Sequence, residues 1–250
     1  MIRGFRTALA FLTRLSLPGG DKGPLQAEDL ARSFAFFPAV GLVVGCLQAA
    51  AAAAMLRFLP APLTAVWALA LGTWLTRGLH LDGLADVADG VGGGFDPQKR
   101  LAIMKDSRVG AFGVMAVGLA LLLKAAALAH LLEAGALASL VIVPAVSRCA
   151  MVWCSFAMPY ARSEGGLGKP FVDHVGRKEV GWSTAATLLP GVGLLGLRFV
   201  PVLLTTILAI LGLRILSRRW LGGITGDVLG AANEAVEIVG YTVAAALVLH

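Results

Sequence analysis

Three aspartates, Asp82, Asp86 and Asp89, stand close together in the stretch LHLDGLADVADG. On an α-helix, positions i, i+4 and i+7 lie within about 60° of one another around the axis, so these carboxylates would share one face. A carboxylate is costly in apolar surroundings, and a stripe of three usually faces a cation. Oxygen ligands without Cys or His partners favour Mg²⁺, with Mn²⁺ as an alternative, over zinc. We therefore predict that the three aspartates are catalytic residues and metal ligands.

The spacing of the stripe also bears on how metal would be held. Along a regular helix Asp82 and Asp89 are about 10 Å apart, too far for one ion to bind both. Asp86 lies between them, which fits two ions about 3.5–4 Å apart with Asp86 bridging. The alternative interpretation is a solvated loop with capping aspartates, and Gly83 and Gly90 are compatible with it.

A second acidic face lies near the C-terminus, in TGDVLGAANEAVE. Its acids are Asp227, Glu234 and Glu237. On a helix they fall within about 80° of one another, and the glycines and alanines between them would let another backbone or a ligand approach. We predict that these acids complete the metal site from across a shared cleft. As an alternative, they are solvated or pair with Lys124 or Arg148, two basic residues inside apolar segments.

Basic and polar residues near the acidic stretches could bind phosphate. Together with a metal ion, Lys and Arg neutralise the charge of a transferring phosphoryl group. The predicted substrate-binding residues are Lys105, Arg108, Arg148, Arg162, Lys169 and Asn233. Two further catalytic candidates are His80, a possible base beside Asp82, and Asp106. Read otherwise, the loop charges only orient the chain in a membrane, and His80 is a structural donor.

The elements that carry these residues are those of a membrane protein. The chain is 58% hydrophobic and 14% charged, with a mean hydropathy of +0.81. Its continuous Leu-, Ala- and Gly-rich blocks favour helices over a strand barrel. We predict an all-α, polytopic integral membrane protein with about seven transmembrane helices. The spans run from about 34–59, 61–79, 109–132, 135–158, 180–197, 199–216 and 228–249.

The basic residues predict how these spans are oriented. Most of the 21 Lys and Arg residues fall in the N-terminal segment and in three long polar loops, about 80–108, 159–179 and 217–227. Positive charge is retained in the cytoplasm, so we expect the N-terminus and the active site there, in a bacterial inner membrane, and a periplasmic C-terminus. The net charge of +6 largely follows from this bias, and nucleic acid is not an expected partner.

The N-terminal segment predicts a helix that lies on the membrane surface. Apolar residues form one stripe of it: Ile2, Phe5, Leu9, Leu12 and Leu15. Arg14 interrupts the apolar run and no small-residue cleavage site follows, which disfavours a signal peptide. Pro18-Gly19-Gly20 should end this helix. The three cysteines have no metal-binding spacing, and no linker or repeat divides the chain, so we predict one domain, 1–250.

Several motifs, in chain order, resemble the cobalamin synthase (adenosylcobinamide-GDP ribazoletransferase) family. They are FLTRLSLP (11–18), FFPAVGLVVG (36–45), GLHLDGLADVADG (78–90), MKDSRVGAFG (104–113), YAR with GLG (160–168) and TGDVLGAANEAVE (225–237). The resemblance covers nearly the whole chain. One departure is Arg77, where the family pattern leads us to expect a small residue, often Gly.

The resemblance implies the joining step of nucleotide-loop assembly. A hydroxyl of α-ribazole, or of α-ribazole 5′-phosphate, would attack the cobinamide-linked phosphorus of adenosylcobinamide-GDP, and GMP would leave. It also implies Mg²⁺ as cofactor and membrane lipid as surroundings. A homo-oligomer, or association with other nucleotide-loop enzymes, stays open.

Two other functions compete with this one. A CDP-alcohol phosphotransferase uses similar chemistry, but its DGxxAR pattern is not met, because Asp86 follows Ala85 where that motif has Arg. A cation-coupled transporter would favour acids at mid-membrane and repeated halves, whereas these acids cluster toward one side. Release of GMP from adenosylcobinamide-GDP in the presence of α-ribazole would separate the three.

Overall fold

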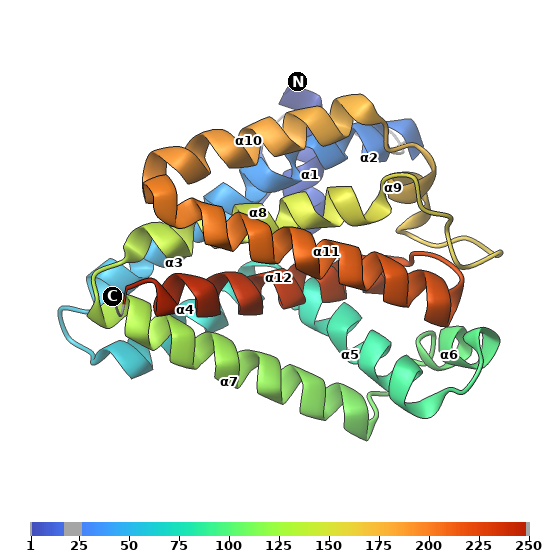
Figure 1. Ribbon diagram of the computed structural model, residues 1–250, viewed down its shortest axis with the longest axis horizontal. Coiled ribbons are helices and arrows are strands. Elements are labelled where there is room, and N and C mark those ends of the chain that lie inside the picture. The colour runs from blue at the N-terminus through green and yellow to red at the C-terminus, as the bar shows by residue number, and fades with distance from the viewer. Residues whose placement is uncertain (1, 18–26, 249–250) are drawn as a thin grey trace.

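The computed structural model describes residues 2–17 and 27–248, and every regular element in these ranges is a helix (Figure 1). The elements are α1 (Ile2–Leu12), α2 (Ala27–Ser33), η1 (Phe34–Phe36), α3 (Phe37–Met55), α4 (Ala61–Leu75), α5 (Leu79–Gly93), α6 (Pro97–Ile103), α7 (Ala111–Glu133), α8 (Leu137–Ser155), α9 (Lys169–Asp173), α10 (Arg177–Leu195), η2 (Gly196–Arg198), α11 (Phe199–Leu221) and α12 (Gly226–Ala246). The prediction of an all-α chain is confirmed.

The C-terminal helix α12 lies inside the bundle. It packs against α5, α7, α8 and α11, and Figure 1 shows it running beside α11. Where α12 meets α5, Gly83 lies against the backbone of Asp227, and a Cβ at that position would lie 2.7 Å from the Asp227 carbonyl oxygen. Gly230 of α12 faces Gly83 in turn. Small residues on both helices therefore permit the close approach that brings their acidic residues together.

Four segments of the described chain are long and apolar enough to cross a membrane. They are Ala27–Met55, Ala111–Glu133, Leu137–Ser155 and Arg177–Leu221. The last holds α10 and α11, which Figure 1 shows as two antiparallel helices joined at η2. The predicted segments 61–79 and 228–249 form helices but are not among these candidates. α4 has only 15 residues, and α12 carries polar residues near its middle. The count of seven spans stays a prediction.

The helix is interrupted between α4 and α5, so α4 ends at Leu75, a few residues before the predicted end of this span at about 79. Arg77 and Gly78 adopt φ angles of 57° and 68°, in the left-handed region that ends a helix. The Arg77 guanidinium donates to the carbonyl oxygens of Ala10 (2.9 Å) and Thr13 (2.6 Å). Arg14 donates in return to the Trp74 carbonyl oxygen at 2.7 Å. Arg77 thus ties the N-terminal segment to the start of α5, which gives this unexpected residue a structural role.

The N-terminal helix forms as predicted, although it ends earlier. α1 ends at Leu12, and the Thr13 hydroxyl donates to the Leu9 carbonyl oxygen at 2.7 Å. Leu9 and Leu12 are buried, whereas Ile2 is exposed. Whether this helix lies on a membrane surface stays a prediction. The Pro18-Gly19-Gly20 turn and the end of the last predicted span at Leu249 lie outside the described residues.

Candidate active site

Two helices bring three carboxylates into one group. Asp82 and Asp86 lie on α5, and Asp227 lies in the first turn of α12. We call these three residues the carboxylate cluster. Burial, and then the charges of Asp227 and Asp82, raise the pKa of Asp86 to about 7. The cluster lies outside the four candidate membrane segments. The two acidic stretches therefore meet across α5 and α12 through Asp82, Asp86 and Asp227, and metal binding by these acids stays a prediction.

One arginine faces the carboxylate cluster. Arg162 donates to Asp227 Oδ2 at 2.6 Å and to the Met104 carbonyl oxygen at 3.5 Å. Thr225 is the N-cap of α12: its hydroxyl oxygen accepts from the Val228 amide and its O–H donates to Asp227 Oδ2 at 3.2 Å. Asp227 is therefore held in a fixed orientation. Arg162 supplies a single positive charge to three carboxylates.

The excess of negative charge suits a divalent cation. In the part of the chain that the structure describes, no group of three or more His, Cys, Asp or Glu side chains is arranged to hold a metal ion by itself. Mg²⁺ commonly keeps several waters and takes one or two protein carboxylates together with substrate phosphates. Burial is the largest cause of the raised pKa of Asp86, and the nearby charges of Asp227 and Asp82 add to it. The donor set thus fits an ion whose coordination a phosphate substrate completes.

Asp89 has a different set of contacts from its neighbours on α5. Its carboxylate accepts from the backbone amides of Gly110 (2.7 Å) and Gly113 (2.8 Å) at the start of α7. A Cβ at either glycine would collide with this carboxylate. The capping role that we considered as an alternative is what these contacts support for Asp89. Its predicted role as a metal ligand, and the bridging of two ions along α5, stay predictions.

Farther along α12, two glutamates belong to a separate buried group. Lys124 Nζ lies 2.6 Å from Glu234 Oε2 and 3.1 Å from Glu237 Oε2, and Arg148 pairs with Glu237 Oε1. All four residues, which we call the buried ion network, are at most 8% exposed. The pairing with Lys124 and Arg148 that we considered as an alternative is the one found. These contacts do not support metal ligation by Glu234 and Glu237 or substrate binding by Arg148.

His80 and Asn233 face this network and not the carboxylate cluster. His80 is 2% exposed and lines a small cavity of about 20 Å³ together with members of the network. Burial and the nearby Arg148 lower the pKa of His80 well below its ordinary value, so the imidazole is neutral. Asn233 donates to Glu237 Oε1 at 3.3 Å. His80, predicted as a base, and Asn233, predicted to bind substrate, therefore face the buried ion network instead of the carboxylate cluster.

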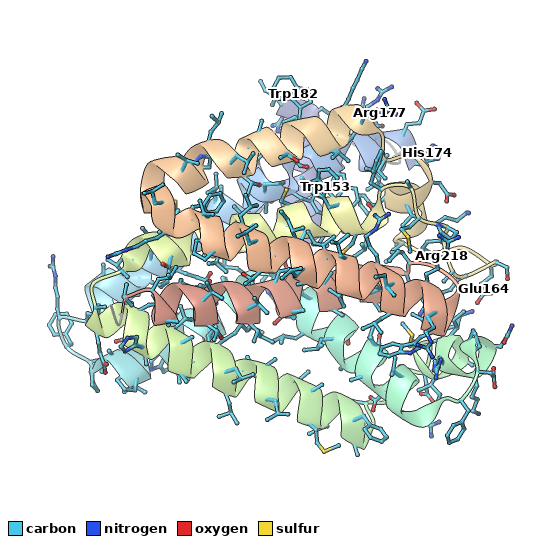
Figure 2. The ribbon with its side chains drawn as sticks, in the orientation of Figure 1. Trp153, Glu164, His174, Arg177, Trp182 and Arg218 are labelled. Carbon is cyan, nitrogen blue, oxygen red and sulfur yellow. The ribbon has the colours of Figure 1, made fainter. Side chains whose placement is uncertain are left out.

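The basic loop after α6 lies beside the cluster. Lys105 pairs with Glu164 at 2.7 Å, which links this loop to the segment that carries Arg162. Figure 2 shows Glu164 near the end of α11 that also carries Arg218. The predicted residues Asp106 and Arg108 pair with each other at 2.7 Å, and hydrogen bonds from Arg108 lower the pKa of the exposed Asp106 to about 2. Lys105 thus contacts the segment that carries Arg162.

The last predicted substrate-binding residue, Lys169, has partners of its own. It pairs with Asp173 at 2.7 Å and lies over the Tyr160 ring.

An open cavity of about 570 Å³ extends from Asp82 between α1, α5 and α7, with Phe11, Arg77 and Val117 among its lining residues. Sequence reasoning missed this cavity, Glu164 and the contact of Thr225 with Asp227. Only Thr225 had a recognisable signal, because a Thr before Gly-Asp at a helix start is a common N-cap.

The chain belongs to the cobalamin-5-phosphate synthase family, whose model matches residues 4–245. Curated relatives named adenosylcobinamide-GDP ribazoletransferase are similar over nearly their whole length. The protein of Syntrophobacter fumaroxidans is 47% identical over 97% of this chain and 98% of its own. The protein of Chlorobaculum parvum is 42% identical over 98% of this chain and 96% of its own. The protein of Clostridium tetani is 36% identical over 98% of this chain and 97% of its own. No solved structure matches the chain.

Proposed function

We propose that this protein is an Mg²⁺-dependent adenosylcobinamide-GDP ribazoletransferase. A hydroxyl of α-ribazole, or of its 5′-phosphate, attacks the phosphorus that is attached to cobinamide. The P–O bond to GMP breaks, GMP leaves, the hydroxyl loses its proton, and adenosylcobalamin or its 5′-phosphate forms. The observation that carries the proposal is the carboxylate cluster beside Arg162, in a chain of this family.

Asp82, Asp86 and Asp227 are the residues that would hold Mg²⁺, and Mn²⁺ is an alternative. When bound, the ion neutralises charge on the pyrophosphate oxygens. The three carboxylates exceed the one guanidinium beside them, so they favour a cation and repel a free phosphate. This cluster therefore selects a metal-bound pyrophosphate over the bare anion.

Arg162 and Lys105 are the residues best suited to bind substrate phosphate. Arg162 has one terminal nitrogen on Asp227, and its buried Nε has no hydrogen-bond partner among the described residues. A guanidinium can donate two parallel hydrogen bonds to a phosphate, whereas Lys acts as a point charge. Lys105 would then add charge from the neighbouring loop. The half-apolar cavity next to Asp82 has room for part of a large amphipathic substrate.

The proposed setting is the cytoplasmic side of a bacterial inner membrane. Seven spans with a cytoplasmic N-terminus would bring the basic loops, and with them the carboxylate cluster, to the side where nucleotides are found. An N-terminal helix on the membrane surface would then cover one wall of the cavity beside Asp82. Self-association, or association with other enzymes of nucleotide-loop assembly, is compatible with this setting.

The test is an assay of the purified protein in detergent or vesicles. Adenosylcobinamide-GDP, α-ribazole and Mg²⁺ are supplied, and GMP and the corrinoid product are measured by chromatography. We expect GMP and product in equal amounts, no GMP without α-ribazole, and loss of both on addition of EDTA. GMP release that does not need α-ribazole, or activity that survives EDTA, would contradict the proposal.

A further inference from the structure

A large apolar cavity lies on the other side of α8 from the buried ion network. It has a volume of about 550 Å³ and lies between α8, α10 and α11. All three helices belong to the candidate membrane segments. In Figure 1, α10 and α11 meet at η2 and diverge toward the far end of α8. The cavity therefore opens among helices whose outer faces are apolar.

The threonine hydroxyls in this cavity already have hydrogen-bond partners. The hydroxyls of Thr184 and Thr187 donate to carbonyl oxygens of their own helix, at 2.7 and 2.9 Å. The Thr206 hydroxyl does the same on α11 at 2.8 Å. Each threonine thus directs its hydrogen-bonding group to the backbone and contributes carbon atoms to the wall. Such a wall suits a hydrocarbon chain better than a polar ligand.

A second cavity of about 490 Å³ adjoins the first. It lies between α8 and α10, and the two cavities share Trp153, Phe156, Thr184 and Leu188 as lining residues. The indole of Trp153 donates to Thr184 Oγ1 at 3.0 Å, so a bridge between α8 and α10 separates the two spaces. Two apolar cavities that meet at one bridge match a ligand with two hydrocarbon chains.

Both cavities have an arginine in the lining. Arg214 lines the first and Arg177 the second. One terminal nitrogen of Arg214 donates to the carbonyl oxygens of Trp153 and Phe156, both at 2.6 Å, which fixes the guanidinium at the end of α8. Figure 2 shows Trp153 between α10 and α11, with Arg177 at the start of α10. Basic pockets between membrane helices are typical binding sites for anionic headgroups.

We propose that these two cavities form a binding site for one anionic phospholipid. An acyl chain occupies each cavity, on either side of the Trp153 bridge, and the phosphate lies at Arg177 and Arg214. The lipid fills the space between α8 and the α10–α11 pair, and so supports the end of α8 that leads into the segment carrying Arg162. The site is separate from the carboxylate cluster and does not depend on the proposed reaction.

The test measures lipid retained by the whole protein. Purified protein is equilibrated with vesicles of phosphatidylglycerol or phosphatidylcholine, re-extracted in mild detergent, and analysed by native mass spectrometry. Ile207, which lines the first cavity and is 43% exposed, is replaced by Trp to fill the space. Leu208→Trp is the matched control, because Leu208 is the next residue on the same helix and does not line either cavity. Arg177→Gln is compared with Lys178→Gln in the same way.

We expect one phosphatidylglycerol per wild-type chain and at least a fivefold lower retention of phosphatidylcholine. Ile207→Trp should lose at least four fifths of the bound lipid, with Leu208→Trp unchanged, and Arg177→Gln should lower retention of phosphatidylglycerol more than Lys178→Gln does. Leu211→Trp, a second substitution in the lining, guards against a folding defect in Ile207→Trp. Equal retention of the two lipids, or equal loss in Ile207→Trp and Leu208→Trp, would overturn the proposal. So would a lipid-free dimer whose interface covers the cavities.

Discussion

The helix α12 carries acids in two regions that differ in how their charges are balanced. At its start, Asp227 joins two aspartates of α5, and Arg162 is the cation bonded to the group. About two turns farther on, Glu234 and Glu237 meet Lys124 and Arg148, so two negative charges face two positive ones. The same residue types therefore serve different purposes. Balanced and buried charges join helices, whereas an excess of carboxylates at the end of a helix pair leaves a place for a cation.

The difference also explains why the two regions should respond differently to substitution. Removing one member of a buried pair leaves a charge without a partner in a low-dielectric interior, which destabilises the fold. Removing one carboxylate from the cluster relieves repulsion and should leave the fold intact. The separation of activity from stability is thus the property that distinguishes them.

The largest expected effect is on activity, from a change in the carboxylate cluster. Asp86→Asn should lower turnover by roughly 10³-fold at any Mg²⁺ concentration, because the charges of both Asp82 and Asp227 act on this residue. Asp82→Asn should be partly rescued by excess Mg²⁺ or Mn²⁺. Initial rates of GMP release measure both. Asp96→Asn is the control, since an Asn there keeps the N-cap of α6. Full activity of Asp86→Asn would remove this residue from the site.

The next effect concerns the buried ion network. Lys124→Met should destabilise the protein by about 3 kcal/mol, because Glu234 and Glu237 lose a shared partner. Adding Glu234→Met, which restores the charge balance, should recover a large part of that loss. Thermal unfolding in detergent measures both variants, with activity expressed per folded protein. A stable Lys124→Met variant with no activity would instead indicate a direct role in the reaction.

A smaller effect is expected in the basic loop. Arg108→Ala should lower turnover about tenfold and leave expression unchanged, because an exposed arginine whose partner among the described residues is Asp106 can turn to a substrate phosphate. Lys99→Ala, in the exposed part of α6, serves as the control. Comparison of kcat with the yield of folded protein distinguishes a substrate-binding role of Arg108 from a structural one. Loss of folded protein in proportion to loss of turnover would show that Arg108 is structural.

The smallest effect is a pH-dependent gain in stability. The pKa of Asp86 is raised to about 7, so the folded protein holds this proton more tightly than the unfolded chain, where the pKa is about 3.9. Wild-type protein without metal therefore loses stability as the pH rises from about 4 to about 7. Asp86→Asn should avoid this loss and be more stable at pH 8 by about 1 kcal/mol after solvent screening, but not at pH 4. Unfolding of both proteins in EDTA at pH 8 and at pH 4 measures the difference in stability. An equal gain in stability at the two pH values would show that the raised pKa of Asp86 is not its cause.

Much of the fold could be predicted from hydrophobic runs. All seven apolar segments form helices, with ends that differ by a few residues. The ends depended on local backbone conformation that composition does not report, as at Arg77 and Gly78, where the left-handed region divides α4 from α5. Whether 228–249 crosses a membrane stays a prediction, because α12 carries buried polar residues among its apolar ones and is not among the four candidate segments.

For the candidate site, the sequence indicated the right stretches but not the partners within them. Helical periodicity placed Asp82, Asp86 and Asp89 on one face, and all three do lie on α5. It could not show that Asp89 faces the amides of Gly110 and Gly113, because those glycines come from a different helix. Likewise, a lysine in the middle of an apolar segment needs a partner, but periodicity alone did not say that Lys124 takes the glutamates of α12.

The central claim is that the carboxylate cluster binds a divalent cation. Binding of Mn²⁺ to the purified protein, measured by electron paramagnetic resonance in the presence of adenosylcobinamide-GDP and without α-ribazole, tests it most directly. The account predicts that wild-type protein and Asp96→Asn bind Mn²⁺ equally well, and that Asp86→Asn binds it at least tenfold more weakly while remaining folded. Equal Mn²⁺ affinity in folded Asp86→Asn and wild-type protein would contradict it.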